Sequence, residues 1–148
     1  MTTDDSSIFP ETTFKSPIEK IWECWTNPLL VMTWFGSDPK GKVLKAELDV
    51  RPGGNFEITF HDSDLTEHTC SGIYDEVQPF SKLTFNWQWK SEPGVESSVS
   101  LLLTPEGKNT RMQFEHKDLG RGSKHDYSKG WHNTFAKLEG LIEVQLQY

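Results

Sequence analysis

The chain has 148 residues, of which 34% are hydrophobic and 12% are aromatic, and its formal net charge at pH 7 is −7. This length suffices for one domain that buries roughly 70% of its unfolded surface, so we expect a single domain over residues 1–148. The negative charge disfavours a nucleic-acid partner and an anionic membrane surface, because both require clusters of Lys and Arg.

The N-terminal part of the chain predicts one edge strand followed by two short helices. The strand is expected within residues 6–14. Ser16 and Glu19 have the S-x-x-E spacing of a capping box, which predicts that the first helix begins there. Asn27 has the side chain of a helix cap and is followed by proline, so a second short helix is expected to begin there and to end at residues 35–36.

The central part of the chain predicts six strands, because apolar and polar residues alternate and give each strand one apolar face. Connections of a few residues between them predict consecutive antiparallel pairing. The turn 51–54 contains two glycines that can take positive φ, and Gly72 inside the third strand indicates a bulge or a sharp bend. The strands are expected at residues 43–50, 55–61, 67–77, 83–90, 99–103 and 112–116.

The C-terminal segment, residues 123–148, is the longest with a helical hydrophobic period. Its apolar side chains recur at steps of three and four and therefore share one helix face. They are Tyr127, Trp131, Phe135, Leu138, Leu141 and Ile142. The predicted fold is α+β, an antiparallel sheet of about six or seven strands curved around this helix, with the two short helices closing one end. The helix can then either fill the hollow of the sheet or roof a cavity.

The cysteines and the N-terminal sequence indicate the cellular compartment of the protein. Cys24 and Cys70 lie far apart in segments of unlike pattern, so we expect free thiols. The N-terminal residues are polar and acidic, which does not fit a signal peptide. No apolar run approaches the roughly 20 residues that a membrane span needs. These features predict a cytoplasmic protein.

Residues that could carry chemistry are few. The five histidines do not form a metal-binding motif, so we expect no metal site and no cofactor. No nucleophile elbow and no phosphate-binding loop is present in the sequence. His116 shares strand parity with apolar neighbours and would point toward the helix, as an acid–base or ligand-orienting group. The alternative is a satisfied histidine near solvent at the end of its strand. Glu76 is a second acid–base candidate if its strand turns it inward.

Six segments of the chain, taken in order, carry a resemblance to a known family. They are Ser16-Pro17-x-x-x-Ile21-Trp22-x-x-Trp25-Thr26-Asn27-Pro28, Trp34-Phe35-Gly36, Asp49-Val50-Arg51-Pro52-Gly53-Gly54, Gly72-x-Tyr74-x-Glu76-Val77-x-Pro79, Leu83-x-Phe85-x-Trp87 and Gly130-Trp131-x-x-x-Phe135-x-x-Leu138. They resemble the homologues of the C-terminal domain of the heat shock protein 90 ATPase activator, within the START-like (SRPBCC, Bet v 1-like) superfamily. The resemblance covers nearly the whole chain.

The resemblance implies a helix-grip fold, usually with a cavity between sheet and C-terminal helix, but it does not imply one activity. Members of the superfamily bind lipids, hormones or polyketide-like molecules, and some act as cyclases or resistance proteins. Three functions therefore stay open. The first is binding of an apolar, lipid-like or polyketide-like small molecule. The second is a chaperone-linked stress or regulatory role. The third is a cyclase, dehydratase or hydrolase-like enzyme.

We favour the binding function and assign no catalytic residue, with His116 and Glu76 as the candidates if the protein is an enzyme. The expected ligand-binding residues share the inward strand parity, the helix face or the mouth of the cavity. They are Trp34, Phe35, Phe56, Ile58, Tyr74, Phe85, Trp87, Leu101, Phe114, His116, Trp131, Phe135 and Leu138. Tyr74 and His116 are the polar members that would orient a ligand. Exposed strand edges permit either a monomer or a homodimer.

Overall fold

The computed structural model describes residues 10–94, 96–117 and 127–145. Its elements follow one another in the order β1 (Glu11–Phe14), α1 (Ile18–Thr26), α2 (Pro28–Trp34), β2 (Lys42–Leu48), β3 (Asn55–His61), β4 (Glu67–Gln78), β5 (Lys82–Trp89), β6 (Glu96–Glu106), β7 (Asn109–Lys117) and α3 (Tyr127–Gln145). Within these residues, no helix is both long enough and apolar enough to cross a membrane.

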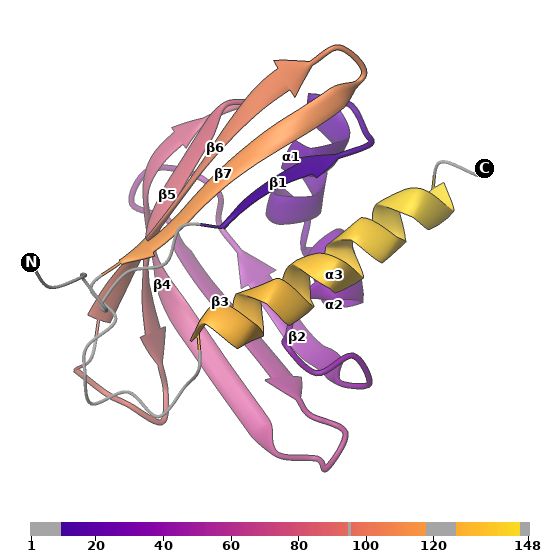
Figure 1. Cartoon of the computed structure of the whole chain (residues 1–148). Coiled ribbons are helices and arrows are strands. Elements are labelled where there is room, and N and C mark those ends of the chain that lie inside the picture. The colour runs from indigo at the N-terminus through magenta and orange to yellow at the C-terminus, as the bar shows by residue number, and fades with distance from the viewer. Residues whose placement is uncertain (1–9, 95, 118–126, 146–148) are drawn as a thin grey trace, which may run out of the picture.

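The strands form one antiparallel sheet in the order β1-β7-β6-β5-β4-β3-β2. Figure 1 shows α3 lying across one face of this curved sheet, with α2 packed against it and α1 beside its later turns. The predicted α+β helix-grip architecture is thereby confirmed, including the two short helices after the first strand. β1 pairs with β7, so the first and the last of the described strands lie side by side in the sheet.

Alternation along the strands sets which side chains face α3. In β5 every second residue is buried, from Leu83 to Trp89. β7 has the same pattern, ending at His116. Burial of these apolar side chains stabilises the sheet by roughly 25 cal/mol for each Å² removed from water. The concave face is therefore lined by large apolar and aromatic side chains.

One of the two predicted helix starts is confirmed and the other is wrong. The Oδ1 atom of Asn27 accepts a hydrogen bond of 3.0 Å from the backbone N–H of Leu29, as expected of a cap. The residue before α1 is Pro17 instead of Ser16, and it has no side-chain cap bond. Ser16 is buried, and its carbonyl accepts a hydrogen bond of 2.8 Å from Thr110 Oγ1. A tertiary contact to β7 thus fixes the position of Ser16, in place of the local capping box.

Glycines allow one tight turn and one close approach of neighbouring strands in the sheet. Gly53 has φ of +84°, which suits the tight turn predicted between β2 and β3. A Cβ atom at Gly72 would collide with the backbone oxygen of Asn86 on β5. The register of the β4–β5 pair shifts two residues further on, between Tyr74 and Glu76. The irregularity expected at Gly72 therefore consists of a close strand approach followed by a bulge.

The core lies between the sheet and the buried face of α3. Four side chains of the predicted helical stripe are buried, namely Trp131, Phe135, Leu138 and Ile142. Leu141 is partly buried against them. The side chain of Tyr127, and the expected helical residues 123–126 and 146–148, lie outside the described part. Both cysteines are free and buried, as expected.

Candidate functional site

An open cavity lies where the first two turns of α3 meet the sheet, and we call it the mouth cavity. Its volume is about 230 Å³. The lining comes from the loop after α2, from β3, β4 and β5, and from the start of α3. Its residues are Phe35, Gly36, Ser37, Phe60, His68, Trp87, Trp89, Lys129, Gly130, Trp131, Asn133 and Thr134.

Aromatic rings from four different elements form the apolar wall of the mouth cavity. The ring centroids of Trp87 and Trp131 are 5.4 Å apart, and those of Trp87 and Trp89 are 5.2 Å apart. Phe35 contacts both Trp87 and Trp131, at 6.0 and 6.1 Å, and Phe60 at 5.6 Å. Most of these pairs meet edge to face or tilted, which suits the ring quadrupoles. The rings hold one another in place and leave a shaped space beside them.

A buried hydrogen-bond chain fixes the orientation of Trp131. Its Nε1–H donates to His116 Nδ1 at 2.9 Å. Because this nitrogen accepts, the neutral imidazole has its proton on Nε2, which lies 2.7 Å from Ser97 Oγ and donates to it. The Ser97 hydroxyl in turn donates to the Trp87 carbonyl oxygen at 3.4 Å. The chain therefore joins two residues of the cavity wall, Trp131 and Trp87, through a histidine with no solvent exposure.

Burial holds His116 in its neutral form. It lowers the pKa of the imidazole from 6.5 to about 3, because a charged ring would lose its hydration. Both ring nitrogens of His116 are engaged with Trp131 and Ser97. The structure thus makes His116 a positioning residue behind the cavity wall, in contrast to a group exposed to a ligand. Its inward direction follows from strand parity, as the sequence predicts.

The loop after α2 is attached to α3 by a half-buried lysine. Lys137 Nζ donates to the carbonyl oxygens of Phe35 and Asp38, at 3.4 and 3.1 Å. Burial lowers the pKa of this ammonium group below its usual value. Gly36, next to Phe35, has φ of +106° and packs against the ring of Phe60. These contacts fix Phe35 at the edge of the cavity.

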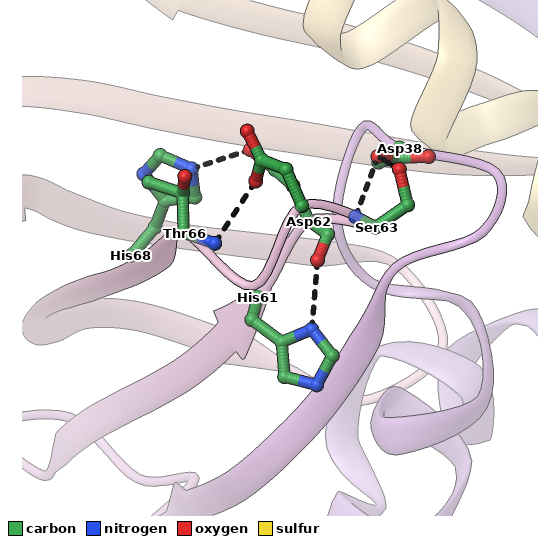
Figure 2. Close-up of polar contacts among 7 residues, drawn as sticks. Asp38, His61, Asp62, Ser63, Thr66 and His68 are labelled. Atoms are coloured by element: carbon green, nitrogen blue, oxygen red, sulfur yellow. Dashed lines mark hydrogen bonds and ion pairs between the residues drawn. The ribbon is translucent and has the colours of Figure 1, made fainter.

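The β3–β4 hairpin closes the other side of the rim through a polar network (Figure 2). His68 Nε2 is 2.8 Å from Asp62 Oδ2. Ser63 donates to Asp38 Oδ2 from both its backbone N–H and its hydroxyl, each at 2.9 Å. Hydrogen bonds from the backbone of Ser63 and Lys40 lower the pKa of Asp38 to about 2. The hairpin, the loop after α2 and helix α3 are therefore linked around the mouth cavity.

The predicted ligand-binding residues separate into three groups in the structure. Three line the mouth cavity, namely Phe35, Trp87 and Trp131. Phe35 and Trp87 also line a much smaller inner void of about 20 Å³. The same void is lined by Trp34, Phe56, Ile58, Tyr74 and Phe85. The remaining predicted residues are buried away from both spaces, and they are Leu101, Phe114, His116, Phe135 and Leu138.

Packed rings fill the space beneath the middle of α3. The ring centroids of Phe114 and Trp131 are 4.6 Å apart, and those of Phe114 and Phe135 are 5.1 Å apart. Trp25 of α1 lies 6.1 Å from both Phe114 and Phe135. Glu76 does not line the mouth cavity, and its carboxylate pairs with Lys82 Nζ at 3.2 Å. The open space thus lies at the mouth of the sheet.

Several lining residues of the mouth cavity are absent from the sequence-based set. Phe60 and Trp89 continue the inward alternation of β3 and β5, so strand parity alone contains the signal for them. His68 belongs to β4 and packs 5.4 Å from the ring of Phe60. Lys129 has no such signal, since a lysine on a helix commonly faces solvent.

Two larger hollows lie on other faces of the molecule. The one of about 430 Å³ is bordered by Glu47, Glu57 and Glu96, and its one aromatic residue is Phe56. The one of about 580 Å³ lies between α1 and the end of α3, where Phe80 is the one aromatic residue. In the described residues, no group of three His, Cys, Asp or Glu side chains could hold a metal ion. Of these three hollows, the mouth cavity has the most aromatic side chains in its lining.

Comparisons with known proteins identify relatives of the chain. The model of a family described as "Activator of Hsp90 ATPase homolog 1-like protein" matches residues 15–143. A crystal structure of a protein from Nitrosomonas europaea has a TM-score of 0.83 at 20% identity, covering 99% of this chain and 100% of the other. The solution structure of an AHSA1-like protein from Aeromonas hydrophila has a TM-score of 0.80 at 17% identity, with coverages of 94% and 93%.

A further crystal structure, of an AHSA1 protein from Silicibacter pomeroyi, has a TM-score of 0.77 at 22% identity and coverages of 96% and 99%. At these identities the solved structures establish the fold alone. The comparison with curated proteins found no match.

Proposed function

Because the chain belongs to the family of Activator of Hsp90 ATPase homolog 1-like proteins, we propose that it binds a small apolar molecule in the mouth cavity. The observation that carries this proposal is an aromatic wall of five rings around an open cavity of about 230 Å³. Rings supply large contact areas with little loss of side-chain freedom, and binding sites for small molecules are rich in them.

The volume of the cavity supports a compact ligand. A cavity of about 150 Å³ in another protein is known to take up benzene. The mouth cavity is about half as large again, so it fits a molecule of one or two rings. A lipid chain would need more space in the interior, and the inner void of about 20 Å³, which is lined by α1, α2 and strands of the sheet, has room for little more than one water molecule. The proposal therefore favours a small ring system over a lipid.

The binding test uses the indole N–H signals of tryptophan in nitrogen–proton correlation spectra. We expect saturable shifts of Trp87, Trp89 and Trp131 with 2-naphthol and 2-naphthoate as probes. The indole of Trp34 provides an internal control, because its Nε1–H donates to the Cys24 carbonyl at 2.9 Å inside the core. No saturable shift with either probe would refute the proposal.

A matched pair of glycine variants tests the location of the site. Gly130 lines the mouth cavity, and its nearest neighbour to an added Cβ is Ser37 at 3.8 Å, so leucine there would extend into the cavity. Gly140 lies on the same helix with open space around it. Both changes replace a helical glycine and raise helix propensity by up to about 1 kcal/mol. We expect Gly130→Leu to abolish probe binding and Gly140→Leu to preserve it.

The free, buried thiols of Cys24 and Cys70 suit a reducing compartment. We propose on this ground that the protein is cytoplasmic. Fractionation of cells that express it would check this, and recovery outside the cytoplasm would contradict it.

A further inference from the structure

From the uncharged polar groups in its lining, we infer that the mouth cavity selects a neutral ring system that carries a carboxamide or a lactam, and that Asn133 binds this amide. The inference rests on the proposed function and adds the chemical class of the ligand. Beside the aromatic rings, the lining contains the uncharged polar side chains of Ser37, Asn133 and Thr134. A ligand with rings alone would leave these groups without a partner from the ligand.

Asn133 lies in the second turn of α3, on the helix face that meets the loop after α2. Gly130 comes three residues before it and Lys137 four residues after it, so the three positions share this face. Lys137 Nζ donates to two carbonyl oxygens of the loop. Gly130 faces Ser37 of the same loop, at 3.8 Å from an added Cβ. Because Gly130 has no side chain, the cavity has space beside Asn133.

The side-chain amide of Asn133 can bind a ligand at two atoms. Asn133 is half-buried, and no hydrogen bond joins its side chain to the described part of the chain. The hydroxyl of Thr134, by contrast, already donates to the Gly130 carbonyl oxygen at 2.7 Å. An asparagine side chain offers N–H donors and a carbonyl acceptor. A carboxamide or a lactam presents the same two kinds of group side by side, so it can form two hydrogen bonds with Asn133 at once.

A buried donor in the aromatic wall adds to the preference for a ligand with an acceptor atom. Trp87 is 3% exposed, and its indole N–H has no hydrogen-bond acceptor in the described part of the chain. An unsatisfied buried donor is unfavourable. Trp87 lines the mouth cavity, so a carbonyl oxygen brought in by a ligand is favoured there over a purely apolar group.

Charged ligands fit the cavity less well than neutral ones. No acidic side chain is among the described lining residues, so a cation would have no carboxylate partner. The imidazole of His68 is paired with the carboxylate of Asp62, and Lys129 is exposed, where an ion pair contributes little. The net charge of −7 also opposes the approach of an anion. An uncharged amide is therefore the polar group that suits this lining.

The test compares three probes with the same ring system and side groups of the same shape. They are 2-naphthamide, 2-acetylnaphthalene and 2-isopropenylnaphthalene, whose side groups offer a donor and an acceptor, an acceptor alone, and neither. Each is titrated into the full chain and into Asn133→Leu, where leucine keeps the branched shape of the side chain and has the higher helix propensity. The probes differ in their own hydration, so the quantity compared between proteins is the ratio of two affinities.

We expect Asn133→Leu to lower the affinity of 2-naphthamide relative to 2-isopropenylnaphthalene by about tenfold or more, because two hydrogen bonds are lost at about fivefold each. The affinity of 2-acetylnaphthalene relative to 2-isopropenylnaphthalene should fall by about fivefold, since one bond is lost. The control is His132→Leu, which removes a polar side chain from an exposed position of the same helix, outside the cavity lining. It should keep both ratios of the unmodified chain.

The outcomes separate the two proposals. If the probes bind but the ratio for 2-naphthamide is unchanged in Asn133→Leu, or falls equally in His132→Leu, the inference is overturned and the proposed function stays intact. Binding of none of the three probes to the unmodified chain would overturn both.

Discussion

The pH dependence of stability should reveal the buried state of His116. The folded pKa of about 3 lies below the value of 6.5 for an ordinary histidine, so the folded protein keeps the ring neutral while the unfolded chain takes up a proton. Stability is therefore full above about pH 6.5 and falls as the pH drops toward 3. The slope approaches 1.4 kcal/mol per pH unit, which amounts to a loss of about 2 kcal/mol between pH 7 and pH 5.

A variant without the imidazole at position 116 isolates the contribution of His116 to the pH dependence of stability. In His116→Gln the amide oxygen can accept the indole N–H of Trp131, and the amide N–H can donate to Ser97, without a titrating ring. The control is His132→Gln, at an exposed position on α3. Unfolding by urea, followed by circular dichroism from pH 7 to pH 5, gives the free energy of each protein.

We expect the unmodified chain and His132→Gln to lose about 2 kcal/mol more than His116→Gln over this range, whatever the stability of His116→Gln at pH 7. Apart from the substituted histidine, each variant has the same titrating groups as the unmodified chain, so the contributions of those groups cancel. An equal pH dependence in His116→Gln and in the unmodified chain would show that the histidine is accessible to protons in the folded state, and would refute the reasoning.

Three further predictions concern packing. Gly72→Ala should destabilise the fold by about 1–3 kcal/mol in urea unfolding, because the new Cβ meets the backbone oxygen of Asn86, and an unchanged midpoint would contradict this. Lys137→Met should cost about 1–3 kcal/mol in the same assay, since two loop carbonyls lose their donor, and a change below about 0.5 kcal/mol would show that water replaces it. Burial raises the pKa of Cys24 to about 11 and raises the pKa of Cys70 well above its usual value, so neither thiol should react with Ellman's reagent until the chain is denatured.

The fold was predictable because its signals are local and repeated. Alternation in β5, for example, makes Leu83, Phe85, Trp87 and Trp89 inward-facing in any antiparallel sheet with a covered face. The prediction of a capping box at Ser16 was wrong for a physical reason. The carbonyl oxygen of Ser16 accepts a hydrogen bond from Thr110 on β7, a tertiary contact that the local spacing of residues does not predict.

The sequence predicted which side chains face α3, but it did not predict where space for a ligand remains between them. Strand parity told which side chains of β5 and β7 face α3, and it placed His116 among them. It could not tell whether those side chains touch. The volume left between Phe114, Trp131 and Phe135 depends on rotamers, and centroid separations of 4.6 to 5.5 Å leave no room for a ligand there.

The hydrogen bond between Trp131 and His116 connects the filled core to the open cavity. One side of the Trp131 ring packs on Phe114, and the same residue forms part of the cavity wall. An indole free to rotate at this position could swing into the cavity and fill it with its own ring. The bond to His116 Nδ1 opposes that rotation, because breaking it would leave a buried donor and a buried acceptor unsatisfied. The hydrogen-bonded pair of Trp131 and His116 thus keeps the mouth cavity open at the edge of the core. This role explains why a fully buried histidine, whose burial is unfavourable, is found behind the cavity wall.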